Sequence, residues 1–421
     1  MSVTEVEKPT AAGACPAFGL PYVPGGAAAA RAAAAEPPER DHALRAIAMA
    51  NSGENRDLVI REAVFVLRSP GRQDVLSFWY AAMALVHAGE TGLAEECCDR
   101  MLCGRRTGTP GAPAEFALAL RGRLAWLHGD PATAIEMLAD ALERDPEPRL
   151  RDLLVAWSIT AHVSRGELDA AYRRMLDHLC CESYSGSDDK PALLAALGEL
   201  ELAAERYEVA RTAFLECGRL LTECGVRNPA VLPWRSRAAL CANASGRHRL
   251  ASVLAERELR LARRWPDPRT LGVAAHAHAV VLGRTSGDAR EAADTLAGGP
   301  AVEELLRARY DLAHFLNAEQ EYPQSRIVLA GVRDLAAKAG YAGWAGRAES
   351  ALDRLRRQAG DRLTAQQRKI AELARSGMSN RRIAEQQFLT VRTVEFHLSS
   401  VYRKLGVAGR RELAALPAPL P

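Results

Sequence analysis

Residues 118–146, "LALRGRLAWLHGDPATAIEMLADALERDP", contain two apolar helical segments on either side of a Gly-Asp turn. Apolar residues recur at intervals of three and four on both sides, which is the spacing of amphipathic helices. Gly129 can end the first helix, and Pro146 can stop the second. Ala134 is small at the point where the two helices would touch. The stretch therefore predicts a helical hairpin.

This hairpin recurs along the chain. Its second half closely resembles a tetratricopeptide repeat. The matching positions are Gly122, Gly129-Asp130, Ala134, Leu138, Ala141 and Pro146. A glycine followed five positions later by a small residue recurs as Gly89 with Ala94, Gly166 with Ala171, Gly246 with Ala251 and Gly287 with Ala292. Weaker copies are Ala210 with Phe214, Ser325 with Leu329, and Gly53. The spacing is nearer about 40 residues than the strict repeat's 34. We therefore expect an all-α solenoid of seven or eight degenerate tetratricopeptide-like hairpins over residues 39–356.

A solenoid of this kind presents an extended concave surface, so its expected role is to bind a small-molecule or protein effector. The alternative is a passive spacer. Tryptophans could line such a groove, but a tryptophan at helical spacing is more often a core residue. We therefore assign no ligand residues among Trp79, Trp126, Trp157, Trp234, Trp265 and Trp344.

Cysteine and histidine spacing gives no support for a metal or a disulfide framework. Nine cysteines include two adjacent pairs, but no C-x-x-C motif occurs. Half-buried residues on packed helices are the preferred interpretation of His178 with Cys180 and Cys181, and of His276 with His278. We expect no metal and no cofactor.

The N-terminal stretch favours a chain without a membrane segment. Residues 11–36, "AAGACPAFGLPYVPGGAAAARAAAAE", are interrupted by Pro and Gly and make a poor signal peptide. No window approaches the 18 consecutive apolar residues of a membrane span. We expect residues 1–38 to be poorly ordered and the protein to be cytoplasmic.

Catalytic motifs are absent from the sequence. A nucleotide-binding P-loop needs a Gly-Lys pair, and none of the five lysines follows a glycine. Neither H-E-x-x-H nor G-x-S-x-G occurs. We therefore expect no catalytic residues and a protein that is not an enzyme.

The C-terminal segment differs from the rest of the chain in charge. Residues 362–412 carry eleven Arg or Lys against four Asp or Glu, a net charge of +7, while the remaining residues carry −4. A small basic module attached to a mildly acidic body is typical of a nucleic-acid-binding protein.

Capping residues divide this basic module into helices. Thr364 and Gln367 form a capping-box pattern, and Gly377 can close the first helix. Ser379 can cap a second helix that runs to about residue 387, and Thr390 can cap a third that ends at residue 406. A short helix, a tight turn and a longer helix are helix-turn-helix organisation.

The third helix, within "LTVRTVEFHLSSVYRKLGV" (389–407), has two distinct faces. One face carries the apolar residues Val394, Leu398, Val401 and Leu405. The opposite face carries Arg392, Phe396, Ser399 and Arg403. An aromatic residue on the polar face is explained if that face enters the DNA major groove, where Phe396 can contact a thymine methyl group or a sugar.

Residues 362–416 resemble the C-terminal DNA-binding domain of the LuxR family, also called GerE-like. The pattern "LT…R…I…LA.SGMSNRRIA….FLTVRTVEFHLSSVYRKLGV" matches the family signature nearly end to end, over about an eighth of the chain. The upstream repeats resemble the sensor region of the large ATP-dependent LuxR regulators. The NTPase module of those regulators is missing here, so ATP-gated control is not implied.

The resemblance implies roles for individual residues. Base reading falls on Glu395, Phe396 and Ser399. DNA-backbone contacts fall on Asn380, Arg381, Arg392, Thr393, Ser400, Arg403 and Lys404. Three positions depart from the family pattern: Gln367 usually acidic, Val391 often Pro, and Glu395 usually basic or polar. A glutamate at position 395 can accept a hydrogen bond from a cytosine amino group.

Two interpretations of the whole chain follow. The first is a sequence-specific transcription regulator whose solenoid, residues 39–356, controls the module at 362–416 through a linker at 357–361. The second is a tetratricopeptide adaptor with a basic tail that binds nucleic acid non-specifically. Expected partners are double-stranded DNA, an effector on the solenoid, RNA polymerase and a second copy of the chain, with no membrane. The family's last helix often mediates dimerisation, but here "RRELAAL" (410–416) is stopped by Pro417, at the start of a short tail (417–421).

Overall fold

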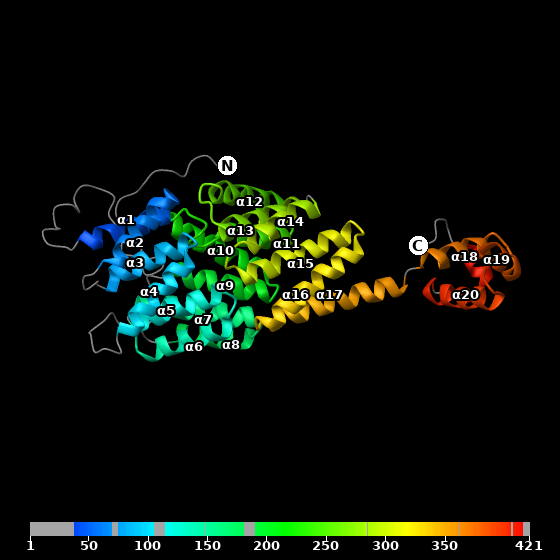
Figure 1. The fold of residues 1–421 in the computed structure, drawn as a ribbon, viewed down its shortest axis with the longest axis horizontal. Coiled ribbons are helices and arrows are strands. Elements are labelled where there is room, and N and C mark those ends of the chain that lie inside the picture. Colours follow the sequence, from blue (N-terminus) through cyan, green and yellow to red (C-terminus); the bar gives the residue numbers. More distant parts are fainter. Residues whose placement is uncertain are drawn as a thin grey trace. The chain divides into compact units, whose positions relative to one another are not determined.

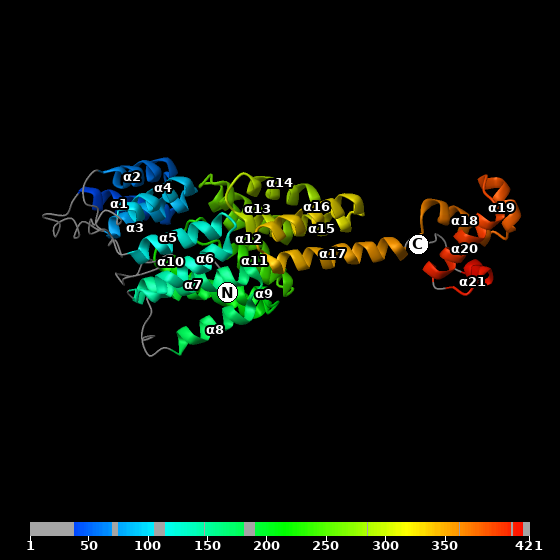
Figure 2. The same cartoon turned by 60° about the horizontal axis from the view of Figure 1, so that its bottom comes forward.

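The structure is a computed structural model that describes residues 38–69, 75–104, 114–146, 148–180, 190–283, 285–361, 363–405 and 407–415. All regular secondary structure in that part of the chain is helical, which confirms the expected all-α class (Figures 1 and 2). The chain divides into two compact units, Met1–Gly346 and Arg347–Pro421. Residues 1–37, expected to be poorly ordered, lie outside the described residues.

The first unit is built from helical hairpins. Consecutive helices pack in pairs, α1 with α2 through to α15 with α16, giving eight hairpins in the described part of this unit. The helices are α1 (Pro38–Ser52), α2 (Arg56–Arg68), α3 (Val75–His87), α4 (Thr91–Gly104), α5 (Ala114–Leu127), α6 (Pro131–Glu143), α7 (Pro148–Arg165), α8 (Leu168–Leu179), α9 (Lys190–Ala203), α10 (Tyr207–Glu223), α11 (Trp234–Ala244), α12 (His248–Ala262), α13 (Pro268–Leu282), α14 (Ser286–Ala297), α15 (Val302–Ala318) and α16 (Tyr322–Lys338).

Each hairpin turn contains a residue with positive φ. These residues are Gly53, Gly89, Gly129, Gly166, Glu205, Gly246, Gly283 and Gln320. The expected small residues that follow them are fully buried, as Ala94, Ala134 and Ala171 show. The weak copies at Ala210 and Ser325 are also true repeats, because Glu205 and Gln320 adopt the left-handed conformation that glycine adopts elsewhere.

One turn was predicted wrongly. Gly287 was expected to end a helix, but it lies in the first turn of α14. The residue that ends α13 is Gly283, with a φ of 56°. Thr285 then caps α14 by accepting a hydrogen bond from the backbone N–H of Asp288. Ala292 is nevertheless buried, because α14 keeps an alanine-rich face toward its neighbours.

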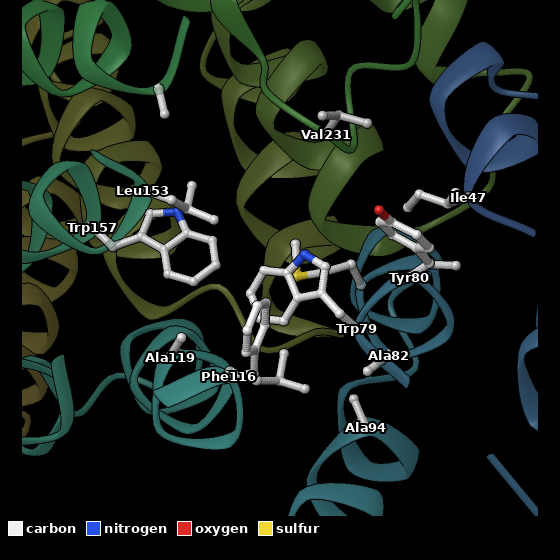
Figure 3. Packing of buried hydrophobic residues seen from close by; sticks show 14 of the residues in the cluster. Ile47, Trp79, Tyr80, Ala82, Ala94, Phe116, Ala119, Leu153, Trp157 and Val231 are labelled. Atoms are coloured by element: carbon white, nitrogen blue, oxygen red, sulfur yellow. The ribbon is translucent and has the colours of Figure 1, made fainter. Parts of the chain in front are cut away.

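The largest apolar core joins hairpins from both halves of the first unit. Trp79 of α3 lies edge-on to Phe116 of α5, with ring centroids 5.4 Å apart, and 6.3 Å from Trp157 of α7 (Figure 3). Val231, which lies between α10 and α11, belongs to the same cluster. Five of the six tryptophans are buried and the sixth, Trp234, is partly buried, so the expectation that they are mainly core residues is confirmed.

The solenoid also contacts itself across a long sequence interval. The turn at Gly53 packs against Asn228, and the side-chain amide of Asn228 donates to the carbonyl of Ala50 at 2.7 Å. Trp265 donates from Nε1 to the carbonyl of His87 at 2.8 Å.

Later turns of the first unit make similar contacts with segments far along the chain. The turns at Gly89, Gly129 and Gly166 abut Asp267, Val302 and Gly343, which lie near the starts of α13, α15 and α17. A Cβ atom at Gly129 would lie 2.5 Å from Val302, so a glycine is required for this approach. Four successive early turns therefore meet segments at or before the starts of three later hairpins and of α17, and the superhelix closes on itself.

Helix α17 (Ala342–Asp361) spans the division between the two units. The division falls at Gly346, about ten residues before the expected boundary at 356. Residues 357–361, expected to be a linker, continue the backbone of α17 as a helix. The change from repeat to module therefore occurs within one helix.

Two of the histidines weighed as metal ligands have carboxylate partners. His178 Nε2 lies 2.7 Å from Asp152 Oδ1, and His276 Nε2 lies 2.8 Å from Asp311 Oδ2. These contacts join neighbouring helices. Cys224 is disulfide-bonded, which the sequence did not predict. Within the described ranges, no helix is long and apolar enough to cross a bilayer.

Candidate nucleic-acid interface

The helices of the C-terminal module begin and end where the capping residues predicted. They are α18 (Ala365–Arg375), α19 (Asn380–Gln387), α20 (Val391–Leu405) and α21 (Arg410–Ala415). Both arms of the Thr364–Gln367 capping box are present. Ser379 caps α19, and Thr390 Oγ1 accepts from the backbone N–H of Thr393 at 3.1 Å. Gly377 has a φ of 88° after α18, as expected for a helix-ending glycine.

A small apolar core fixes the orientation of α20. Val394, Leu398 and Val401 are buried against residues of α18, α19 and α21, and Leu405 is partly buried there. Ile370 and Ile383 are the fully buried isoleucines of α18 and α19 in this cluster. The predicted inward face of α20 is therefore confirmed.

The opposite face of α20 is exposed. Phe396 has 73% of its surface exposed, and Arg392, Glu395, Ser399 and Arg403 are exposed beside it. These positions follow the three- and four-residue spacing that places side chains on one stripe of a helix. The stripe offers two cations, one carboxylate, one hydroxyl and one aromatic ring on a single face, which is a suitable set for contacts with phosphates and base edges.

Three of the expected backbone-contact residues also hold the module together. Asn380 Oδ1 accepts from Arg410 Nη2 at 2.7 Å, which ties the start of α19 to α21. Gln367 donates from Nε2 to Ser400 Oγ at 3.2 Å, and its Oε1 accepts from Lys404 Nζ at 2.9 Å.

Gln367 is therefore more than a helix cap. It is buried, and its amide links the first turn of α18 to the last two turns of α20. Sequence reasoning treated it only as a capping-box residue and as a departure from the family pattern. The signal that could have revealed its role is that an amide both donates and accepts, so it can satisfy Ser400 and Lys404 together.

The other two backbone candidates lie outside the stripe, Arg381 on α19 and Thr393 on α20. Arg381 is highly exposed and lies 3.4 Å from Glu385 one helical turn later, an ion pair that solvent weakens. Thr393 is partly buried, and its hydroxyl lies 2.7 Å from that of Thr390.

Sequence reasoning missed a second exposed aromatic residue. Phe388 has 96% of its surface exposed and a φ of 54°, in the turn between α19 and α20. Its left-handed conformation lets the next residue, Leu389, donate its N–H to the carbonyl of Ala384 at 2.9 Å and pack against the core. The turn thus needs a positive φ, which a phenylalanine rarely adopts.

Comparison with known proteins assigns this module to a family. Residues 361–416 match the family model "Bacterial regulatory proteins, luxR family". Two curated proteins are each 45% identical over 51 residues, covering 12% of this chain and 6% of each relative. Their names are "Putative HTH-type transcriptional regulator Mb0914c" from Mycobacterium bovis and "Putative HTH-type transcriptional regulator MT0914" from Mycobacterium tuberculosis.

Two solved structures are similar to this chain at low sequence identity. A Rap protein complexed with Competence and Sporulation Factor has a TM-score of 0.45 at 10% identity, covering 76% of this chain and 98% of that one. A signal transduction ATPase with a tetratricopeptide repeat sensor, from Pyrococcus horikoshii, has a TM-score of 0.40 at 12% identity, covering 86% and 51%. These likenesses concern the helical architecture alone.

The match to residues 361–416 defines the class of the C-terminal domain. Residues 361–416 are a LuxR-family helix-turn-helix domain, joined to an N-terminal region of tetratricopeptide-like helical hairpins. A domain of this family implies binding to DNA.

Proposed function

We propose that the protein is a sequence-specific transcription regulator in which the solenoid senses an effector and controls the helix-turn-helix domain. The observation that carries the DNA-binding half of this proposal is the exposed stripe on α20, with Phe396 73% exposed between Arg392 and Arg403. An aromatic ring left in solvent costs hydration free energy that contact with a base or sugar recovers. No catalytic role is part of this proposal.

Within the stripe, the polar and apolar side chains divide into two tasks. Glu395 and Ser399 reach base edges through hydrogen bonds, and Phe396 makes the apolar contact with a thymine methyl group. Arg392 and Arg403 neutralise phosphates on either side and set the register of the helix in the groove.

The remaining backbone candidates act while keeping their contacts within the module. The Lys404 ammonium carries three hydrogens, so it can hydrogen-bond Gln367 and a phosphate together. Ser400 can likewise donate its own proton while accepting from Gln367. Asn380 keeps its amide N–H groups for a phosphate because Arg410 uses only its oxygen. Arg381 and Thr393 complete the proposed backbone contacts.

The proposed setting is the cytoplasm, with the protein on the nucleoid when it is bound to DNA. RNA polymerase and a second copy of this chain are the proposed macromolecular partners besides DNA. The competing adaptor hypothesis gives the basic module no base preference.

The test is gel retardation of the full-length protein on the promoter fragments nearest its own gene, with an excess of unrelated DNA as competitor. The regulator hypothesis predicts a retarded complex that survives the competitor and a protected footprint at one site. Equal competition by every DNA sequence would favour the adaptor hypothesis and reject the base-reading roles.

A further inference from the structure

Charged residues line the interior of the solenoid, on the first helices of successive hairpins. Arg237 of α11 lies with its Nε 2.6 Å from Glu199 Oε1 of α9. Arg307 of α15 lies with its Nη2 3.5 Å from both Glu199 and Glu303. The charges are deeply placed, so each would be costly without its partner. The network joins three hairpins through their inner helices.

Arg269 of α13 and Glu304 of α15 form a second buried pair. The Nη2–Oε1 distance is 2.7 Å, and Nε of Arg269 donates to the same oxygen at 3.0 Å. Burial opposes ionisation of Glu304, but Arg269 and Arg237 outweigh it and lower the pKa of Glu304 to about 2. The charge of Arg269 is thus already neutralised within the fold.

Arg123 of α5 lies beside this second pair and lacks a carboxylate of its own. Within the described ranges it forms no ion pair, and Glu304, already held by Arg269, is the carboxylate whose field reaches it. Burial and the charge of Arg269 lower the pKa of Arg123 to about 9, so it remains a cation near neutral pH. Arg123 is partly buried, and a guanidinium in that position without a carboxylate partner is uncommon, because its charge is costly away from water.

The guanidinium of Arg123 lies over the rings of two tryptophans, Trp126 and Trp157. Its central carbon lies 4.5 Å from the ring centroid of Trp126 and 5.4 Å from that of Trp157. Cation–π contacts of this kind stabilise the charge but leave the N–H edges of the guanidinium free. Those edges have the fork geometry that matches a carboxylate or a phosphate in a bidentate contact.

The guanidinium borders open space. Two adjoining cavities share Arg123, Trp157, Val231 and Arg269 in their walls, and both are partly open to solvent. Asp267 also lines the smaller cavity. Its carboxylate caps α13, where it accepts a hydrogen bond from the backbone N–H of Thr270 at 2.8 Å.

A second polar group in the wall also lacks a partner. His87 of α3 lines the smaller cavity, is 4% exposed, and its Nδ1 has no hydrogen-bond partner among the residues that the structure describes. Burial, together with the charges of Arg123 and Arg269, lowers the pKa of His87 to about 3, so the ring is neutral. A ligand in the smaller cavity that reaches this nitrogen would supply the partner it lacks.

We propose that this interior cavity binds a small organic oxyanion, a carboxylate or a phosphate ester, held in a bidentate contact by Arg123, with His87 hydrogen-bonding a second polar group of the ligand. The proposal rests on the proposed sensing role of the solenoid and names the class of effector. A planar ligand fits best, because Trp126 and Trp157 present flat apolar walls beside the charge.

Occupation of this cavity would tie together helices from both halves of the unit. Arg123 and Trp157 come from the first four hairpins, whereas Arg269 and Val231 come from the segments that pack onto them. A ligand that bridges the two favours the closed superhelix over any more open arrangement, by as much as its affinity for the two arrangements differs.

The test uses the full-length protein and the probes benzoate and phenyl phosphate, with benzamide as the neutral analogue of benzoate. Tryptophan fluorescence reports occupation because Trp126 and Trp157 flank the guanidinium. We expect saturable binding of at least one oxyanion. The variant Arg123→Gln should weaken it about tenfold or more, which corresponds to about 1.4 kcal/mol. Arg123→Lys retains the charge but not the forked N–H geometry, so its affinity should lie between those of the wild type and Arg123→Gln.

The matched control is Arg121→Gln, which removes a charge from the same helix at a residue that is ion-paired with Asp99. Binding to benzoate alone would assign a carboxylate site, binding to phenyl phosphate alone a phosphate site, and binding to both a general oxyanion site. Three results would each overturn the proposal: no saturable binding to the wild type, undiminished binding in Arg123→Gln, or benzamide binding as tight as benzoate. DNA retardation by the same samples separates the two proposals, because a wild-type protein that binds its DNA site but neither oxyanion rejects the cavity assignment alone.

Discussion

The arginines of the C-terminal module and those of the solenoid interior lie in opposite environments. On α20, Arg392 and Arg403 project into solvent on a face shared with Phe396. Inside the solenoid, Arg237 and Arg269 are held by the carboxylates of neighbouring hairpins. A hydrated arginine stays available for a phosphate, whereas a buried one must be matched within the fold.

The comparison shows why net charge identified only one of the two regions. Residues 362–412 carry a net charge of +7 because eleven cationic residues outnumber four carboxylates, and Arg392 and Arg403 lie on an open face. The interior network is nearly balanced, so it leaves no trace in composition. Arg123 combines features of the two regions, since it lies in the solenoid interior but, like Arg392 and Arg403, forms no ion pair with any residue that the structure describes.

The largest expected effect comes from breaking a buried pair. Glu304→Ala should lower the free energy of unfolding by about 3–5 kcal/mol, because it leaves Arg269 buried without its carboxylate. Urea denaturation followed by circular dichroism measures the change. Glu223→Ala is the control, since its pair with Arg219 is exposed and should contribute less than about 0.5 kcal/mol. Equal losses in both variants would contradict the contrast between buried and exposed pairs.

A pH series tests the interior further. The pKa of His87 is about 3 in the folded protein, against 6.5 for a free histidine. The unfolded chain therefore binds a proton first, so His87 stabilises the fold above pH 6.5 and its contribution falls as the pH drops toward 3. Between these pH values the contribution of His87 to the free energy of unfolding falls by about 1.4 kcal/mol per pH unit.

His87→Gln should remove this part of the acid sensitivity, and urea midpoints at pH 7 and pH 5 measure it. His248→Gln, at an exposed position, is the control and should keep the wild-type dependence. An unchanged pH dependence in His87→Gln would show that the imidazole is hydrated in the fold.

Base reading should be the next largest effect. Glu395→Gln or Ser399→Ala should cost about 1–3 kcal/mol of binding free energy on the preferred DNA site and relax the preference at particular base pairs. Both side chains are exposed, so stability should stay unchanged. Competition binding with single-base variants of the site measures the effect. A uniform loss on all sequences would place these residues on the backbone instead.

Phosphate contacts should give a smaller and sequence-independent effect. Arg392→Ala or Arg403→Ala should weaken binding to every sequence alike and reduce the slope of log K against log salt by about one. Fluorescence anisotropy over a salt series measures the slope. Arg144→Ala, which removes an exposed arginine from the first unit, should leave it unchanged. A change of base preference in either α20 variant would mean that the arginine reads a base.

The smallest expected change in stability is that of Phe396→Ala. Its ring is exposed, so the free energy of unfolding should move by less than about 0.5 kcal/mol while site discrimination falls. Leu398→Ala, on the buried face of the same helix, should instead cost about 2–5 kcal/mol. Thermal melts and competition binding measure both variants. A large loss of stability in Phe396→Ala with specificity intact would contradict the groove-facing role.

The sequence alone determined what depends on local spacing. The caps at Thr364, Ser379 and Thr390 placed the helices of the module, because a cap acts on backbone groups only two or three residues away. The two faces of α20 followed from helical periodicity for the same reason. Spacing also found the repeat where glycine marks the turn, and it failed at Gly287 because Gly283 takes that role four residues earlier.

Only the tertiary structure decided which distant residues meet. Nothing local links Gly129 to Val302, Trp265 to the carbonyl of His87, or Gln367 to Lys404. These contacts depend on the accumulated twist of the stacked hairpins and on the packing of α18 against α20, to which every intervening residue contributes. The sequence predicts how each hairpin forms. It does not predict that the superhelix closes, and that closure places Arg123 at a cavity between two tryptophans, where it forms no ion pair with any residue that the structure describes.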